Sequence, residues 1–205
     1  MASGTVRGVA SRTLSAIYVY PIKSCRAVAL DSVTVSTIGL SGDRLWQVVD
    51  GGQRGLTQRQ HRVLATVQPE HIFEQSAPFS DAAPILLTAE QSLAWLVERA
   101  SESFDMDRFR PNLVVRGSEP WEDTWATVRI GAAELRCAVP WPRCAIPQMD
   151  QVTADRHREP AKVLRRHRRC TEAPTLRPAL RGLVEGNSLF GVACAIGRRW
   201  CRPAR

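Results

Sequence analysis

The stretch PWPRCAIPQMD (140–150) places Cys144 directly after Arg143 and among three prolines. A neighbouring guanidinium favours the thiolate of a cysteine, and the thiolate is both a nucleophile and a ligand for soft metals. Because helices and sheet interiors tolerate prolines badly, we expect residues 140–150 to form a rigid, irregular loop. The simpler alternative is a small buried thiol, which is the more frequent role of a free cysteine.

A second group of candidates consists of polar residues at the ends of predicted strands. Each cation in it lies near a proline, a glycine or an acidic residue, where a strand gives way to a loop: Lys23 with Ser24, Arg44, Arg59, and Arg110 with Asn112. Arginine and lysine bind phosphate by charge-assisted hydrogen bonds. Singly, each is more simply a solvated surface charge. Together with a thiolate loop, they suit a phosphate-bearing ligand that also offers a metal to the sulfur.

Two other chemistries fit the residues less well. A cysteine protease needs a histidine base, but no family-type signature surrounds Cys144, although His157 and His167 follow it. A zinc site built from these two histidines and Cys170 lacks the usual paired ligand spacing. The six cysteines include no CxxC pair, and no secretory signal is visible. We therefore expect reduced thiols and a cytoplasmic location.

The elements expected around these residues are mostly strands. Short β-branched or aromatic runs from Leu14 to about Thr66 predict a small antiparallel sheet or partial barrel, and residues 67–84 a polar connector. A buried strand then leads into a helix capped by Thr88 with Gln91.

The second half of the chain continues this pattern. A hairpin over 126–139, turning at Gly131, leads into the Cys144 loop, and residues 159–169 form a helix with Pro160 in its first turn. SLFGVACAIG is a last buried strand. The fold class is therefore mostly β with a few helices (α+β). Neither glycine fingerprint of nucleotide-binding folds is present.

The charge of +8 lies entirely in the second half of the chain. Residues 1–102 hold nine Lys+Arg and nine Asp+Glu, whereas residues 103–205 hold nineteen and eleven. Residues 156–169 alone carry seven basic residues and one Glu. This segment leaves open a module that binds nucleic acid or an acidic partner, although a solvated helix face is the simpler interpretation and nucleic acid is not expected. No run of about 18 apolar residues occurs, so no membrane span is expected.

Several motifs occur in collinear order between Leu14 and Gly197: YPIKSCRAV, GLSGDRLWQVVD, GLTQRQ, APILLTAEQSL, RFRPNLVV, WxxxWATVRIG, PRC and EPAKVLRRHRR. Their combination resembles proteins that carry a MOSC domain after its N-terminal β-barrel domain, the family of the mitochondrial amidoxime-reducing component and its bacterial relatives. The resemblance implies a shortened N-terminal β-barrel-like domain over residues 14–84, packed on a MOSC-type β-barrel domain over residues 85–205.

The resemblance also implies a molybdenum cofactor, a pyranopterin phosphate whose dithiolene holds the metal. Carried over position by position, Cys144 is the protein ligand of molybdenum and Arg143 flanks the metal, so that both belong to the catalytic centre. The implied cofactor-binding residues are Lys23, Ser24, Arg44, Arg110 and Asn112. The implied activity is reduction of small N-hydroxylated substrates to amines, with electrons from a separate haem, flavin or iron–sulfur protein. Pyridoxal phosphate binding is a further family-level association.

The sequence departs from the family pattern near the proposed metal. Pro142 stands where relatives have a serine-type hydrogen bonder, and residues 146–150 lack the family's hydroxyls. The connector is several dozen residues shorter, and the tail after Gly197 does not match the family's closing strand. These departures favour, as an alternative to the enzyme, a MOSC-like carrier of the cofactor or of sulfur that does not turn over.

Overall fold

The computed structural model describes residues 12–57, 83–174, 176 and 178–196 of the 205-residue chain. Arg59, all but the end of the 67–84 connector and the tail after Gly197 lie outside these residues. Within the described ranges, no helix has both the length and the apolar character that a membrane crossing requires.

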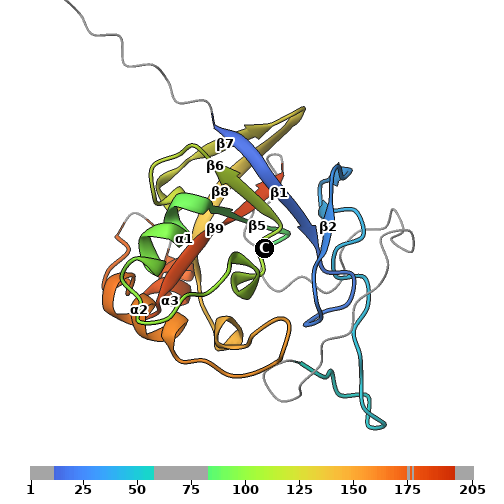
Figure 1. The fold of residues 1–205 in the computed structure, drawn as a ribbon. Coiled ribbons are helices and arrows are strands. Elements are labelled where there is room, and N and C mark those ends of the chain that lie inside the picture. Colours follow the sequence, from blue (N-terminus) through green and yellow to red (C-terminus); the bar gives the residue numbers. More distant parts are fainter. Residues whose placement is uncertain (1–11, 58–82, 175, 177, 197–205) are drawn as a thin grey trace, which may run out of the picture.

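Seven of the described strands form one mixed sheet (Figure 1). Its strand order is β2-β1-β6-β5-β9-β8-β7. Its members are β1 (Thr13–Val19), β2 (Val28–Leu30), β5 (Ile85–Ala89), β6 (Leu113–Arg116), β7 (Thr127–Ile130), β8 (Ala133–Pro142) and β9 (Leu189–Ile196). In the described part, β5 pairs with β6 in parallel and the other neighbours are antiparallel. A small separate ladder joins β3 (Val35–Ser36) and β4 (Gly39–Leu40).

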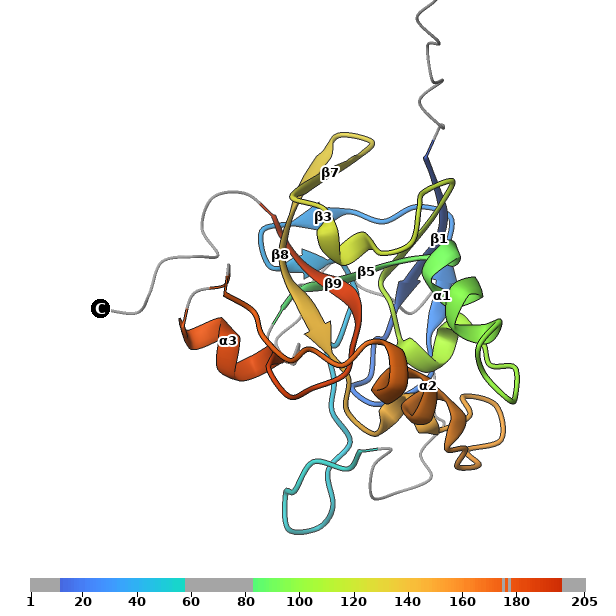
Figure 2. The same ribbon diagram turned by 90° about the vertical axis from the view of Figure 1, so that its left-hand side faces the viewer.

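The α-helices are α1 (Glu90–Val97), α2 (Glu159–His167) and α3 (Pro178–Val184), and the 3-10 turns are η2 (Met106–Phe109), η3 (Glu122–Thr124) and η4 (Ile146–Gln148). In both ribbon views α1 and α2 lie near each other (Figure 1 and Figure 2). They share one apolar cluster, in which Leu96 of α1 and Leu164 of α2 pack with Phe190 of β9. These contacts attach both helices to the sheet through strand β9.

The largest core is formed by strands from both halves of the chain. Val19 of β1, Leu87 of β5 and Cys194 of β9 belong to the same buried cluster. A separate cluster joins α3 to the sheet through Val184 and Leu189. Because the early strands share a sheet and a core with the later ones, they hold the loops of both halves in fixed relation. The division into domains at residue 84 stays a prediction.

Most predicted elements are confirmed, including the mostly β fold with few helices. The hairpin turns at Gly131, whose φ is +55°, and the last strand and the helix that begins near Pro160 form as expected. The helix α3 was not predicted from the sequence. Two of the predicted strands do not form: RLWQVVD and the described part of GLTQRQ make only isolated bridges. One of these bridges joins Val49 to Gly55.

The capping box at Thr88 is wrong. Pairing of β5 with β6 continues through Thr88 and Ala89, so α1 begins only after the strand ends and Ala89 is its N-cap. The Thr88 hydroxyl lies 3.3 Å from the sulfur of Met106. The ladder hydrogen bonds, which the local pattern does not reveal, therefore decide where the helix starts.

The prediction of an irregular loop over 140–150 is wrong for its first three residues. β8 runs through Pro140 and Pro142, which pair with Val192 and Leu189 of β9. The register shifts between Pro140 and Pro142, and β7 pairs with β8 only as far as Arg136, so this end of β8 has a ladder on one side. Prolines are tolerated at such bulges and edges because no ladder N–H is needed there.

Gly191 is a position at which a side chain should not fit. Its φ is +79°, and an added Cβ would lie 2.9 Å from Leu86 Cδ1 and 3.1 Å from the Leu87 carbonyl oxygen. We predict that Gly191→Ala lowers the free energy of unfolding by about 2 kcal/mol or more, measured by urea unfolding. Gly131→Ala is the matched control, because its φ is also positive but an added Cβ meets nothing within 4 Å. Equal losses in the two variants would contradict the steric argument.

Glu122 of η3 makes stability depend on pH. It is only 1% exposed, accepts a hydrogen bond from the Ser92 hydroxyl, and has its pKa raised by burial from 4.5 to about 7. Below pH 4.5 its contribution to stability is fully present, because both states are protonated. As the pH rises toward 7 the unfolded chain ionises first, so stability falls, by up to about 3 kcal/mol.

We predict that Glu122→Gln removes most of this pH dependence, because the amide does not ionise. Urea unfolding of the wild type and the variant at about pH 5 and about pH 8 measures it. A variant that loses as much stability over this range as the wild type would exclude Glu122 as the source.

Candidate functional site

The seven residues that the family resemblance assigns to the site line a single pocket of about 240 Å³. They come from four places in the chain: Lys23 and Ser24 after β1, Arg44 after β4, Arg110 and Asn112 between η2 and β6, and Arg143 and Cys144 after β8. Apolar residues of β5, β8 and β9 form other parts of the lining, among them Leu86, Trp141 and Ala193. None of the described residues that line the pocket is acidic.

Backbone strain is concentrated at this pocket. Ser24, Arg44 and Arg110 have φ values of +63°, +52° and +55°, and they are three of the five described non-glycine residues with positive φ. A left-handed conformation costs about 1–2 kcal/mol for a residue with a side chain. Such strain persists where surrounding contacts fix it, commonly at binding sites. The loops are therefore held in unfavourable conformations at the residues that the pocket uses.

Tyr20, which the sequence did not single out, contacts two of the cations through its ring. The guanidinium of Arg110 is 4.1 Å from its ring centroid and that of Arg44 is 5.3 Å from it. The ring is buried, and the hydroxyl donates a 2.9 Å hydrogen bond to the carbonyl of Pro111. An aromatic face attracts cations, so the ring helps to hold two like charges side by side. Burial also raises the pKa of Tyr20 above its ordinary value, so the hydroxyl stays protonated.

Asp43 neutralises one of these cations. It is fully buried, accepts a 2.8 Å hydrogen bond from the backbone N–H of Tyr20, and forms an ion pair with Arg44. Arg44 itself is 17% exposed. The sequence signal for this arrangement is the adjacent pair Asp43-Arg44 after the glycine turn.

Arg110 is buried without a carboxylate partner among the described residues. It donates to the carbonyl of Cys25 and, at 3.3 Å, to the amide oxygen of Gln151. Its side chain forms no ion pair in the described structure, and burial lowers its pKa. A buried cation that meets only neutral acceptors is costly unless an anion approaches it.

The guanidinium of Arg143, the residue before Cys144, likewise meets no carboxylate among the described residues. One guanidinium nitrogen donates a 2.7 Å hydrogen bond to the carbonyl of Phe109, whereas Nε and the other terminal nitrogen are buried without a partner in the described part of the chain. Burial lowers its pKa to about 10, against the opposing effect of Cys144. Unpartnered buried donors are rare in folded proteins, and each one invites a search for a missing ligand. Arg143 therefore offers hydrogen bonds that the protein itself does not use.

Asn112 lines the pocket, but its amide is bonded to the protein backbone. Its oxygen accepts a 3.1 Å hydrogen bond from the Leu86 N–H, and its nitrogen donates to the Tyr18 carbonyl at 3.2 Å. The same oxygen lies 3.4 Å from a guanidinium nitrogen of Arg44. The observed role of Asn112 is thus to join β1, β5 and β6 at the pocket and to orient Arg44.

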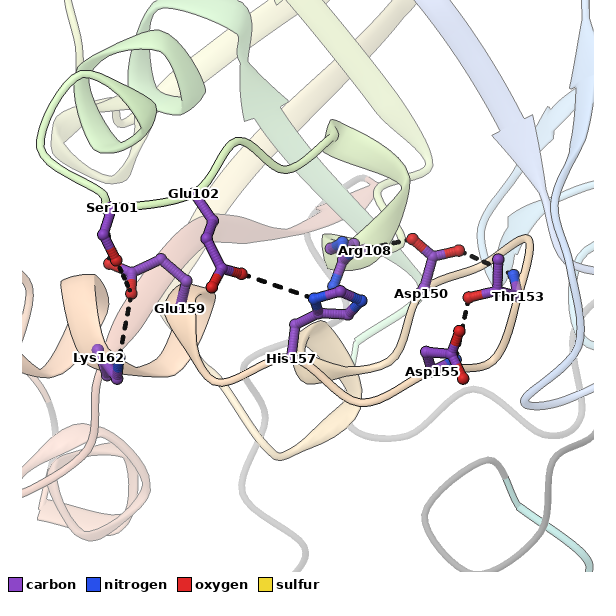
Figure 3. Close-up of polar contacts among 9 residues, drawn as sticks. All are labelled: Ser101, Glu102, Arg108, Asp150, Thr153, Asp155, His157, Glu159 and Lys162. Carbon is purple, nitrogen blue, oxygen red and sulfur yellow. Dashed lines mark hydrogen bonds and ion pairs between the residues drawn. The ribbon is translucent and has the colours of Figure 1, made fainter.

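The two arginines of RFRPN hold the segment that follows the cysteine. Arg108 forms a 2.8 Å ion pair with Asp150 (Figure 3). The Asp150 carboxylate also accepts hydrogen bonds from the backbone N–H groups of Val152 and Thr153. This closes a turn that presents Gln151 to Arg110. Arg108 thus has a structural role that differs from that of Arg110, two positions along the chain.

Further polar contacts fix the start of α2. Glu159 accepts hydrogen bonds from the backbone and hydroxyl of Ser101, and His157 Nδ1 lies 3.6 Å from a carboxylate oxygen of Glu102 (Figure 3). His157 is therefore engaged with a carboxylate, and His167 packs edge-on against Trp95 at 5.5 Å. Within the part of the chain that the structure describes, no three His, Cys, Asp or Glu side chains gather to hold a metal ion.

Cys144 is exposed, so the alternative of a small buried thiol is wrong. It lines the pocket described above and also a second pocket of about 520 Å³ that opens beside α2. Arg143 borders both pockets. An exposed sulfur between two hollows, with a positive charge next to it, is accessible to a ligand from either side.

Comparison with known proteins agrees with this picture. The model of the MOSC domain matches residues 74–199, and that of the MOSC N-terminal beta barrel domain matches residues 11–108. Mitochondrial amidoxime reducing component 2 of Rattus norvegicus is 33% identical over 66% of this chain and 40% of its own length. The Bos taurus protein of the same name is 24% identical over 88% of this chain and 77% of its own.

The bovine alignment runs over 267 positions, more than the 205 residues of this chain, so the bovine protein carries insertions relative to it. A third relative, molybdenum cofactor sulfurase of Arabidopsis thaliana, is 42% identical over 28% of this chain and 8% of its own length. The chain thus spans about two fifths of the rat protein and a small part of the plant one. The two domain models together cover all of the described residues, and the chain belongs to the MOSC-domain family.

Proposed function

We propose that the chain binds a molybdenum cofactor in the pocket of about 240 Å³ and uses it to reduce small N-hydroxylated substrates to amines. The observation that carries the proposal is the pair of buried guanidiniums beside the exposed Cys144, those of Arg110 and Arg143, which meet no carboxylate among the described residues. Electrons would come from a separate haem, flavin or iron–sulfur protein.

The residues present fit this group. A phosphate-bearing ligand would accept a hydrogen bond from the Nε or the terminal nitrogen of Arg143 that the described residues leave without a partner, because guanidinium and phosphate form strong charge-assisted hydrogen bonds. Lys23, Ser24, Arg44 and Arg110 line the same pocket and would hold the polar parts of the cofactor. The Cys144 thiolate suits a soft metal site. When bound, the cofactor would supply two-electron chemistry at its metal.

The chain's own residues would hold the site in place and supply its positive charge. The guanidinium of Arg143 is held by the carbonyl of Phe109, and its pKa of about 10 keeps it protonated near neutral pH. It can therefore donate hydrogen bonds to an oxygen of a bound molecule next to Cys144. Asn112 orients Arg44, and the turn at Gln151 supports Arg110.

The relatives' names support the same class. Two are called amidoxime reducing components and one a molybdenum cofactor sulfurase. Their names give no substrate, donor or location for this chain. The cytoplasmic location expected from the sequence stays a prediction, since the amidoxime reducing components carry "mitochondrial" in their names.

A non-catalytic carrier of the cofactor or of sulfur is the second candidate. Pro142 and Ile146 line the pocket beside Cys144, where the family pattern has hydroxyl-bearing residues, so this part of the lining supplies no side-chain hydrogen bond. Pyridoxal phosphate, the other family-level association, would satisfy the same cations but would not use Cys144 as a ligand. A carrier would retain the cofactor and show no turnover.

We predict that Cys144→Ser lowers the reduction of benzamidoxime, measured with an artificial electron donor, by at least about 100-fold. Because Cys144 is exposed, the melting temperature should stay close to that of the wild type. Cys170→Ser is the control, since Cys170 lines neither pocket, and it should keep full activity. Unchanged activity in Cys144→Ser would exclude this cysteine as the ligand, and a cofactor-loaded wild type without turnover would favour the carrier.

A further inference from the structure

The second pocket next to Cys144 has a distinct chemical character. It has a volume of about 520 Å³ and lies between the Cys144 loop with η4, the helix α2 and the turn at 186–188. Pro147, Ala161 and Leu164 give it an apolar side. Arg165 of α2 and Arg169, which follows the end of this helix, give it a charged side.

The backbone holds Arg169 in fixed relation to the cysteine. The N–H of Arg143 donates a 2.8 Å hydrogen bond to the carbonyl of Ser188, and Ser188 forms a β-bridge with Arg169. The residues next to this bridge are hydrogen-bonded as well. The Leu189 N–H donates to the Arg168 carbonyl at 2.9 Å, and the Cys170 N–H donates to the Asn187 carbonyl at 2.9 Å. One short ladder therefore connects the residue before Cys144 with the end of α2.

The positive charge in this pocket is not compensated by the described residues. Lys162 and Arg168, on the same helix segment, form ion pairs with Glu159 and Asp123. Arg165 and Arg169 form no ion pair in the described structure, and no acidic residue lines the pocket there. An apolar wall with two guanidiniums at one side that no described carboxylate neutralises suits a molecule with an apolar body and an anionic group.

We infer that substrates approach Cys144 through this second pocket, and that Arg165 and Arg169 select those that carry a carboxylate or phosphate. The inference rests on the proposed function, because it assigns the first pocket to the cofactor and the second to the substrate. Cys144 borders both pockets, so the cofactor and the substrate would meet there. The basic residues of this face thus serve substrate binding in place of nucleic acid.

The selectivity can be measured on the cofactor-free full-length chain with two alkylating reagents of similar shape. Iodoacetate is anionic and iodoacetamide is neutral, and their rates at Cys144 are read by mass spectrometry of the peptide that contains it. We expect Arg165→Gln and Arg169→Gln each to lower the ratio of the iodoacetate rate to the iodoacetamide rate about threefold, the effect of one charge several ångströms away in water. A change in the thiolate fraction cancels from this ratio, because both reagents react with the same thiol, and an unchanged melting temperature shows that the fold is intact.

Arg166→Gln is the matched control. It removes the same charge from the same helix, but Arg166 does not line the second pocket. The ratio should therefore stay close to that of the wild type. If Arg166→Gln lowers the ratio as much as the other two, or if none of the three does, the assignment of an anion site to Arg165 and Arg169 is overturned.

A second measurement uses the cofactor-loaded protein. It compares kcat/KM for benzamidoxime with kcat/KM for its 4-carboxylate. We expect the wild type to prefer the carboxylate. Arg165→Gln and Arg169→Gln should each remove this preference, and Arg166→Gln should retain it. Reduction of both compounds without preference would overturn the inference and leave the proposed function standing. Reduction of neither would contradict the proposed function, while the alkylation ratios would still decide whether the anion site exists.

Discussion

The site depends on one constraint: it buries positive charge that the described residues do not neutralise. Arg110 and Arg143 are each held by backbone carbonyls, and neither meets a carboxylate in the described structure. Moving such charges out of water is unfavourable by several kcal/mol. The ring face of Tyr20 recovers part of that cost for Arg110. The unused donors of Arg143 make an anionic ligand the natural complement of the pocket.

The surrounding fold keeps this arrangement from relaxing. The left-handed residues Ser24, Arg44 and Arg110 lie in loops anchored on β1 and β6, and Asn112 links the ends of β1, β5 and β6 by its amide. The Arg108–Asp150 ion pair fixes the turn after the cysteine. Strain and unpaired charge are therefore found at the same place, which is expected where binding takes priority over local stability.

The sequence was sufficient to predict most strands of the large sheet, the hairpin at Gly131 and, through the family resemblance, the residues that line the pocket. The pocket residues could be found because each motif pairs a polar side chain with a chain-reversing residue. Tyr20 could not be identified, since a tyrosine before a proline gives no sign that two guanidiniums will flank its ring. The true start of α1 and the passage of β8 through Pro142 depend on pairing with distant strands, which local sequence does not encode.

The most direct test of the central claim is the molybdenum and pterin content of the full-length chain, purified from cells that make the cofactor. The account predicts stoichiometric molybdenum and pterin in the wild type. In Arg110→Gln both should be reduced, because a buried cation that holds the cofactor is lost. A wild-type protein that carries neither molybdenum nor pterin, or an Arg110→Gln variant that carries as much of both as the wild type, would contradict it.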